Sequence, residues 1–437
     1  MPVTPSHHGR IRLAGTAAMA LLALTSPAAA WAATPAAPSA LPLGATAART
    51  DETAPSQAGL DPAGHRRTGL DRAALDRTLK AFHDAGMYGA YSAARDGAEE
   101  WRGAAGVADV GTQRPTTPQM QHRIGSITKT FTAVAVLQEV AKGHIALDAP
   151  IGRYLPDLVP GERGRAITVR MLLNHTSGIG DYNPAIFSTP DSLETNRFRD
   201  FDPRELARLG LKAKPLGTPG QAHHYSNTNY VIAGLLLHKV TGTSPDAYIT
   251  EHVIRKAGLR HTYFPRSPYI TGPHAKMYEA AFGGFRPPHE FSVYNMSYTS
   301  TAGSLISTMP DLNRFYRELL GGRLLAPTQL REMKTTVPTE DGTIRYGLGL
   351  FQRTLPCGET VWGHNGIVLG AMTWSLSSED GRRQISLGFN LTRYQTLDGN
   401  NRPQPSPIDT AMDAHLNQAM CGTQHGPRTD SVSARAH

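Results

Sequence analysis

The chain has little cysteine, the residue on which thiolate metal sites and thiol redox chemistry depend. Only two cysteines occur among 437 residues, Cys357 and Cys421, and neither has another Cys or a His at metal-ligand spacing. The His-Glu-x-x-His pattern of zinc peptidases is absent, as is the Gly-x-Ser-x-Gly pattern that places a serine on a strand-to-helix turn. We therefore expect neither a metal site nor a cofactor.

Long apolar runs are also scarce, and the one near the N-terminus is too short to cross a bilayer. Residues 13–24 are apolar, whereas a membrane-spanning helix needs about 20 such residues. Basic residues precede this stretch and small residues follow it, namely His7, His8, Arg10 and Arg12, then Ala30, Trp31 and Ala32. This is the pattern of a secretory signal peptide. We predict a signal peptide over residues 1–32, a secreted protein and no membrane anchor.

No cluster of one charge sign accompanies the positive balance of the chain. The formal net charge is +8, from 44 Lys and Arg against 36 Asp and Glu. The positive charges are scattered and no nucleic-acid motif accompanies them, so we expect no nucleic-acid partner. Two interpretations of the excess remain open: affinity for anionic cell-envelope polymers, or an ordinary basic exported protein.

Composition divides the rest of the chain into a leader, one folded region and a tail. Residues 33–64, rich in Ala, Pro, Thr and Ser, predict a disordered leader, and residues 426–437 predict a polar tail. Residues 65–425 are long enough for one large domain, and the chain is 40% hydrophobic, which suffices for a sizeable core. Within this region, residues of about 145–300 are rich in loops and short helical pieces, which indicates an insertion.

Hydrophobic spacing predicts helices and strands on both sides of that insertion. Leu75, Leu79 and Phe82 indicate a helix over 71–85, and an apolar stretch indicates a buried helix over 127–141. The other predicted elements are helices at 226–241, 246–257, 309–320 and 409–420, and strands at 88–95, 99–103, 345–352, 360–364, 370–377 and 384–391. Successive strands joined by short turns predict an antiparallel sheet, covered by helices from both chain ends.

Three short motifs suggest a nucleophilic serine. Ser126 and Lys129 are three residues apart, so on a helix they share a face, and the amine could take the proton of the hydroxyl. Tyr225-Ser226-Asn227 and His364-Asn365-Gly366 follow in order. Each motif alone has a plain structural explanation: a capped helix start, a turn, and a tight hairpin. Their order, spacing and context together favour acyl transfer through Ser126.

In this combination the chain resembles the serine β-lactamase and penicillin-binding-protein superfamily, in its class C-like branch. There the elements are Ser-x-x-Lys, Tyr-x-Asn and Lys- or His-x-Gly, whereas the Ser-Asp-Asn and Lys-Thr-Gly motifs of class A are absent here. The likeness is greatest to the secreted bacterial D-alanyl-D-alanine carboxypeptidases/transpeptidases and covers about residues 65–425. Further stretches also resemble the family, namely residues 172–178 (LLNHTSG), 301–304 (TAGS), 346–350 (YGLGL), Cys357-Gly358 and Cys421.

The resemblance implies a fold and a set of roles. The fold would be an α/β (α+β) sandwich, with a five-stranded antiparallel sheet flanked by helices and the helix-rich insertion at about 145–300. Lys129 and Tyr225 would share the role of general base, and His364 would hydrogen-bond to them where lysine is more usual. Because histidine titrates near 6.5, activity would then depend on its protonation. The N–H groups of Ser126 and Ile367 would form the oxyanion hole. Asn227 would hold the substrate amide and orient Lys129.

The substrate-binding positions depart from the carboxypeptidase pattern. Asn365 stands between His364 and Gly366, and Ile367 replaces a hydroxyl. Phe351 falls where an arginine would bind the terminal carboxylate, with Arg353 two residues later on the same strand face. Tyr298 takes the place of a tryptophan. These departures weaken carboxylate recognition and leave the nucleophile intact.

An even pair of cysteines in an exported protein favours a disulfide. A Cys357–Cys421 bridge would join the last helix to the strand that carries His364, and it would contribute about 2–4 kcal/mol.

Four functions remain open from the sequence. The first is a D-alanyl-D-alanine carboxypeptidase that acts on peptidoglycan stem peptides and is inhibited by β-lactams. The others are a serine esterase or amidase on the same scaffold, a β-lactamase, and a catalytically idle sensor of muropeptides or β-lactams. We expect a monomer.

Overall fold

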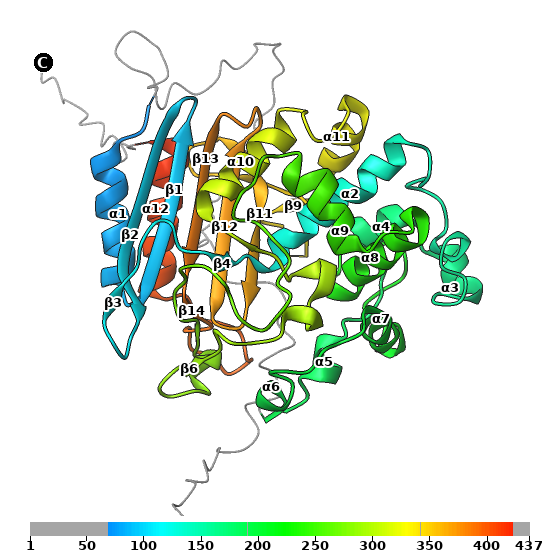
Figure 1. The fold of residues 1–437 in the computed structure, drawn as a ribbon, viewed down its shortest axis with the longest axis horizontal. Helices are drawn as coiled ribbons and strands as arrows, with labels where there is room; N and C mark the ends of the chain where they lie inside the picture. Colours follow the sequence, from blue (N-terminus) through cyan, green and yellow to red (C-terminus); the bar gives the residue numbers. More distant parts are fainter. Residues whose placement is uncertain (1–68, 190, 341, 423–437) are drawn as a thin grey trace, which may run out of the picture.

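A nine-stranded antiparallel sheet forms the centre of the molecule, in the order β3-β2-β1-β13-β12-β11-β10-β9-β8 (Figure 1). The computed structural model describes residues 69–189, 191–340 and 342–422, so the predicted signal peptide, leader and tail lie outside the described residues. The strands of the sheet are β1 (Gly89–Asp96), β2 (Glu99–Asp109), β3 (Arg114–Pro115), β8 (Val337–Pro338), β9 (Arg345–Tyr346), β10 (Phe351–Thr354), β11 (Thr360–Val368), β12 (Ala371–Ser378) and β13 (Arg383–Phe389).

The predicted architecture is confirmed, with a wider sheet than the five strands expected. Five strands are long, and short strands at both edges add the other four. The predicted strand at 345–352 is two short strands, because the chain turns at Gly347 and Gly349. Gly349 has φ +71°, and a Cβ there would lie 2.9 Å from the carbonyl oxygen of Lys129. The glycines therefore allow this turn to pack closely on the helix that carries Lys129.

Helices from the two ends of the chain cover one face of the sheet. They are α1 (Arg72–Asp84) and α12 (Pro407–Cys421), blue and red in Figure 1, and they pack against each other. A capping box begins α12: the Ser406 side chain accepts a hydrogen bond from the helix backbone, and the Asp409 carboxylate accepts one from the Ser406 backbone N–H. The helix therefore starts at Pro407, two residues before the predicted start. Cys357 and Cys421 form the expected disulfide, with Cα atoms 6.0 Å apart. This bond joins the end of α12 to the turn between β10 and β11.

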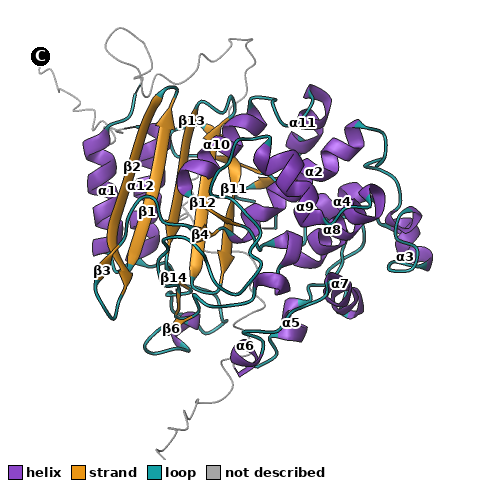
Figure 2. Cartoon of the chain, viewed as in Figure 1, coloured by secondary structure: helices purple, strands orange, loops and turns teal. Residues whose placement is uncertain are grey.

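The other face is covered by α10 (Met309–Leu320) and by a helix-rich region that lies to one side of the sheet (Figure 2). At its centre is α2 (Thr128–Ala141), which is buried on nearly every side, as predicted from its apolar sequence. The helices around it are α3 (Gly161–Ala166), α4 (Val169–Leu173), α5 (Asn183–Ile186), α6 (Asp191–Thr195), α7 (Pro203–Lys212), α8 (Asn227–Thr241), α9 (Pro245–Ile249) and α11 (Pro327–Lys334). The predicted helix at 246–257 is α9 followed by a π-helical turn, Thr250–Arg255.

Two small sheets and one ionic cluster complete the packing. β4 (His122–Arg123) pairs with β7 (Ile306–Ser307), and β14 (Leu391–Thr392) and β6 (His289–Glu290) flank β5 (Tyr278–Glu279).

Within the described ranges, no helix has both the length and the apolar character needed to cross a membrane.

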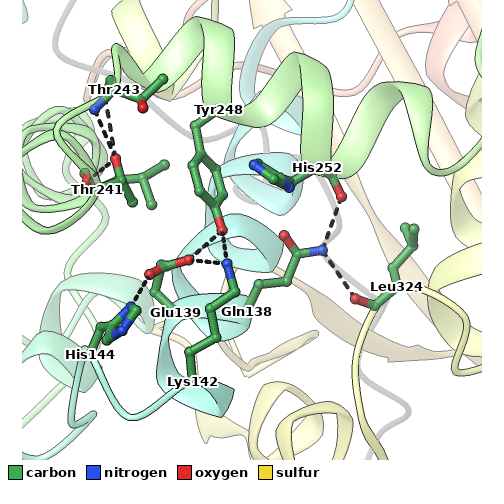
Figure 3. Close-up of polar contacts among 10 residues, drawn as sticks. Gln138, Glu139, Lys142, His144, Thr241, Thr243, Tyr248, His252 and Leu324 are labelled. Carbon is green, nitrogen blue, oxygen red and sulfur yellow. Dashed lines mark hydrogen bonds and ion pairs between the residues drawn. The ribbon is translucent and has the colours of Figure 1, made fainter.

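The ionic cluster lies at the C-terminal end of α2 (Figure 3). The buried carboxylate of Glu139 accepts hydrogen bonds from Lys142 Nζ at 2.7 Å and from the hydroxyl of Tyr248, and it lies 2.7 Å from His144 Nδ1. Burial opposes the charged form of Glu139, but these bonds outweigh it and lower its pKa to about 2. The cluster ties the end of α2 to α9.

Candidate active site

Ser126 lies in the 3-10 turn η3 (Gly125–Ile127), immediately before α2. Strand β11 packs directly on this turn, and two glycines permit the contact. Gly125 has φ +52°, and a Cβ on it would lie 2.8 Å from the backbone nitrogen of Ile367. A Cβ on Gly366 would lie 1.9 Å from the carbonyl oxygen of Ile124 and 2.7 Å from the nitrogen of Ser126. The sequence motifs around Ser126 and His364 are therefore in backbone contact.

Two side chains from distant parts of the chain converge on the hydroxyl of Ser126. Lys129 Nζ is 3.0 Å from Ser126 Oγ, and the Tyr225 hydroxyl is 2.7 Å from it. Lys129 Nζ also lies 2.8 Å from Asn227 Oδ1 and 2.8 Å from the carbonyl oxygen of Ala302. The first two predicted motifs thus meet at one oxygen atom, and the predicted contact of Asn227 with Lys129 is present.

The surroundings shift the pKa values of this lysine and tyrosine in opposite directions. Burial lowers the pKa of Lys129 to about 7, although Asp181 nearby acts to raise it. Burial raises the pKa of Tyr225 above its ordinary value. Near neutral pH a large share of Lys129 is therefore uncharged, while Tyr225 keeps its proton. A neutral amine has two N–H donors, which suit Asn227 and Ala302, and one lone pair, which suits the O–H of Ser126.

Asp181 is a site residue that the sequence did not single out. One of its carboxylate oxygens accepts from the backbone nitrogen of Asn227 at 2.7 Å and from the Asn227 side-chain nitrogen at 2.9 Å. These bonds turn Asn227 Oδ1 toward Lys129. Burial raises the pKa of Asp181, and hydrogen bonds and Lys129 oppose this. The two residues are 46 positions apart in the sequence, and no motif links them.

His364 lies behind the reacting atoms rather than among them. Its Nε2 atom is 2.8 Å from the Tyr346 hydroxyl, and its Nδ1 atom contacts the carbonyl oxygen of Asn365. In the described part of the chain, no hydrogen bond joins His364 to Ser126, Lys129 or Tyr225. Burial lowers the pKa of His364 to about 3. The imidazole is thus neutral across physiological pH, so the pH dependence expected from its titration has no support in this environment.

His175, in the stretch 172–178, packs against Tyr225. The two ring centroids are 4.2 Å apart, and His175 lies 3.1 Å through Nδ1 from the side-chain nitrogen of Asn229. The imidazole is fully buried, and its backbone has φ +61°, an unusual conformation for a residue with a side chain. The sequence carried this stretch only as part of the family resemblance, and the structure shows that it supports the tyrosine.

A pocket beside Ser126 contains only part of the predicted substrate-binding set. Among the predicted residues, Asn227, Tyr298 and Ile367 line it. Asn365 and Gly366 do not line it, although Gly366 packs against η3. Other lining residues, which the sequence did not suggest, are Asn183, Phe187, Leu369 and Arg393. The walls therefore combine aromatic and aliphatic side chains with polar ones, among them Asn183, Asn227, Thr299 and Arg393.

Phe351 and Arg353 lie on the other side of the sheet. They are two residues apart on β10 and so share a face, as expected, but this is the face that α12 covers. Phe351 is buried against the rings of His364 and Trp374. Arg353 lies near Asp413 of α12, whose charge supports the guanidinium against the effect of burial on its pKa. The arginine that does reach the pocket is Arg393, and its Nη1 donates to Glu279 Oε2 at 2.6 Å.

The chain is similar to several known proteins. The Beta-lactamase family profile matches residues 75–389. A D-stereospecific amidohydrolase from Streptomyces sp. superposes with a TM-score of 0.71 and 36% identity, covering 81% of this chain and 99% of that chain. The putative penicillin-binding protein PbpX of Bacillus subtilis is 25% identical over 67% of this chain and 68% of its own length. Esterase EstB of Burkholderia gladioli is 33% identical over 47% of this chain and 55% of its own.

These similarities differ in extent. The chain spans from about two fifths to two thirds of the length of the curated relatives it matches, whereas the amidohydrolase is covered almost completely. The family profile covers most of the described chain, including Ser126, Lys129, Tyr225 and His364. The chain belongs to the β-lactamase family of serine hydrolases.

Proposed function

We propose that the protein is a serine amidohydrolase that forms an acyl-enzyme at Ser126 and cleaves the amide bond of D-amino-acid amides or short D-peptides. The observation that carries this proposal is the convergence of Lys129 Nζ and the Tyr225 hydroxyl on Ser126 Oγ, at 3.0 and 2.7 Å. The similarity to the D-stereospecific amidohydrolase supports the bond type and the stereochemistry.

Acylation requires two proton transfers, one away from the Ser126 hydroxyl and one to the leaving nitrogen. Neutral Lys129 takes the proton of Ser126 as Oγ attacks the carbonyl carbon. The backbone N–H groups of Ser126 and Ile367, which η3 and β11 bring together, would stabilise the oxyanion. Protonated Tyr225, beside Oγ, then supplies a proton to the leaving nitrogen as the carbon–nitrogen bond breaks. Tyr225 recovers its proton from Lys129. Water then takes the place of the leaving amine, the same two residues transfer the protons in the reverse order, and hydrolysis of the ester regenerates Ser126.

The pocket suits a substrate with an apolar side chain and no terminal carboxylate. Phe187, Tyr298 and Leu369 line it, and the charge of Arg393 is balanced by the buried carboxylate of Glu279. An amide leaving group needs no cationic partner, whereas the terminal carboxylate of a D-alanyl-D-alanine peptide does. Arg393 is nevertheless the observation that keeps carboxypeptidase activity as a second candidate, since a substrate carboxylate could compete with Glu279 for it.

Paired substrates separate these functions. We would compare D-phenylalanine amide, L-phenylalanine amide and an acetylated D-alanyl-D-alanine peptide, using wild-type protein and Ser126→Ala. Release of ammonia from the D-amide, at least tenfold faster than from the L-amide and absent in Ser126→Ala, is expected. Faster release of D-alanine from the peptide would favour the carboxypeptidase. Hydrolysis of a simple ester alone would favour an esterase, and no turnover of any substrate would reject the proposal.

The acyl-enzyme itself is tested by mass spectrometry after incubation with benzylpenicillin. An adduct that persists on wild-type protein and is absent from Ser126→Ala is expected. Rapid hydrolysis of the penicillin instead would indicate a β-lactamase.

We also propose that the protein is exported, as the predicted signal peptide implies. The Cys357–Cys421 disulfide supports this, because such bonds persist in oxidising compartments. The N-terminal mass of the protein recovered from culture medium tests it, with cleavage after about residue 32 expected.

A further inference from the structure

A second pocket, separate from Ser126, lies between the β1–β2 hairpin and helix α10. It is lined by Arg95 of β1, Arg102 of β2, Arg314 and Arg317 of α10, and Arg260 of the loop between the π-helical turn Thr250–Arg255 and β5. In the sheet, β1 is three strands from β11, which corresponds to about 14 Å at the usual spacing. The two pockets have no lining residue in common.

The charges around this pocket are unbalanced. Five arginines face two carboxylates, those of Glu100 and Asp311. Glu100 already contacts both Arg95 and Arg102. Asp311 accepts from the backbone of His261 at 2.7 Å and from the hydroxyl of Thr262 at 3.0 Å, so it is occupied by neutral donors. The walls therefore carry three positive charges in excess.

Two of the arginines are free to bind a ligand. The guanidinium groups of Arg260 and Arg314 make no hydrogen bond or ion pair with any residue in the described part of the chain, and both side chains are exposed. Arg317 is partly buried, and its guanidinium contacts Glu318 only at 3.5 Å. Burial lowers the pKa of Arg95, and the charges of Arg317 and Arg314 lower it further, so these cations repel one another. An anion placed among them would relieve that repulsion.

We propose that this pocket binds phosphate groups. The guanidinium fork matches the oxygen geometry of phosphate and donates two parallel hydrogen bonds to it. An excess of three charges suits a dianion, or consecutive groups of a phosphodiester chain, better than one carboxylate. The pocket would thus hold free phosphate or a phosphate-bearing polymer, while Ser126 acts elsewhere on the molecule.

The test compares two double variants of the full chain. Arg260→Gln with Arg314→Gln removes the two unpaired cations of the pocket. Arg72→Gln with Arg77→Gln is the matched control, because it removes two exposed charges from α1, on the opposite face of the sheet. Binding of inorganic phosphate is measured by calorimetry at low and high salt. Wild type and control are expected to bind equally, and the pocket variant at least tenfold more weakly. Wild-type affinity should also fall as salt rises.

Further ligands identify the source of the phosphate. Poly(glycerol phosphate) that binds at least tenfold more tightly per molecule than inorganic phosphate would identify a polymer ligand, and equal affinity would identify a free anion. Tighter binding of citrate than of either would overturn the phosphate assignment. The proposal is also overturned if wild type shows no binding at 10 mM phosphate, or if pocket and control variants lose affinity equally. An unchanged circular dichroism spectrum and urea unfolding midpoint show that the pocket variant is folded.

Discussion

Helix α2 carries a lysine near each end, and each lysine lies over a tyrosine ring. Lys129 Nζ is 4.8 Å from the ring centre of Tyr225, and Lys142 Nζ is 5.4 Å from that of Tyr248. The pairs are alike in composition, yet the pKa values of the two lysines move in opposite directions. Burial lowers the pKa of Lys129 to about 7, whereas the hydrogen bond to Glu139 raises the pKa of Lys142.

The difference arises from solvent and from the nearest carboxylate. Lys129 is fully buried and its hydrogen-bond partners are neutral oxygens, while Asp181 reaches it only through Asn227. Lys142 is half exposed and contacts Glu139 directly. The pKa of a lysine beside a tyrosine thus falls where no carboxylate offsets the cost of burying its charge. Where a carboxylate contacts the lysine directly, the charge is retained in an ion pair.

Replacement of the two lysines should give the largest contrast. Lys129→Met removes the proposed base, and we expect kcat/KM for the D-amide to fall at least 10³-fold. Lys142→Met should leave kcat/KM within about threefold, because that lysine lies at the other end of α2. Steady-state kinetics measure both, with circular dichroism to confirm folding. Similar rates for the two variants would remove the distinction between the helix ends.

The two tyrosines sharpen the comparison with a smaller change. Tyr225→Phe removes the hydroxyl beside Ser126, and kcat/KM should fall about 10²-fold with little loss of stability. Tyr248→Phe should leave the rate unchanged and destabilise the protein by about 2 kcal/mol, because its hydroxyl donates to the charged Glu139 and accepts from Lys142 Nζ. Kinetics and urea unfolding are needed for each variant. Near-normal turnover in Tyr225→Phe would exclude this tyrosine as the proton donor.

Glu139→Gln tests the structural end of the helix alone. We expect a loss of about 2–3 kcal/mol at pH 7, because the buried carboxylate is the acceptor of the whole cluster. The folded pKa of Glu139 is about 2, below its ordinary value, so its stabilisation is complete above about pH 4.5 and decreases as pH falls toward 2. Urea unfolding at pH 7, 4 and 3 should show the gap between wild type and variant shrinking. A constant gap would contradict the depressed pKa.

Replacement of His364 should have the smallest effect, and the pH–rate profile measures it. Lys129 must lose its proton to act as base, and its pKa is about 7, so kcat/KM should rise about tenfold per pH unit below 7 and then level. His364, with a pKa of about 3, does not titrate between pH 5 and 9. His364→Gln should therefore keep the same midpoint. A shifted midpoint in this variant would show that His364 does control the proton balance.

Predictability differed between local and long-range features of this protein. Ser126 and Lys129 meet because three-residue spacing on a helix places side chains on one face, which needs no tertiary information. The long strands follow from short strand-forming runs bounded by turn residues, as at Gly97. The break at Gly347 and Gly349 was missed because it is caused by the close approach of α2, a contact between distant segments.

The binding residues show the same division. The shared face of Phe351 and Arg353 was predictable from strand geometry, but which layer covers that face was not. Asp181 and Arg393 reach the site only because loops remote in sequence pack there. The pKa of Lys129 likewise depends on complete burial, which residue spacing does not reveal.

The sequence by itself therefore determined the meeting of Ser126 with Lys129 and the order of the main elements, because these depend on residue type and local spacing. It indicated Tyr225 only through the order of three motifs, and it favoured a Cys357–Cys421 bridge only through an even cysteine count in an exported protein. The tertiary structure decided which end of α2 and which faces of the sheet are buried from solvent. Desolvation and the position of carboxylates, both products of long-range packing, lower the pKa of Lys129, keep His364 neutral and leave an excess of positive charge in the arginine pocket.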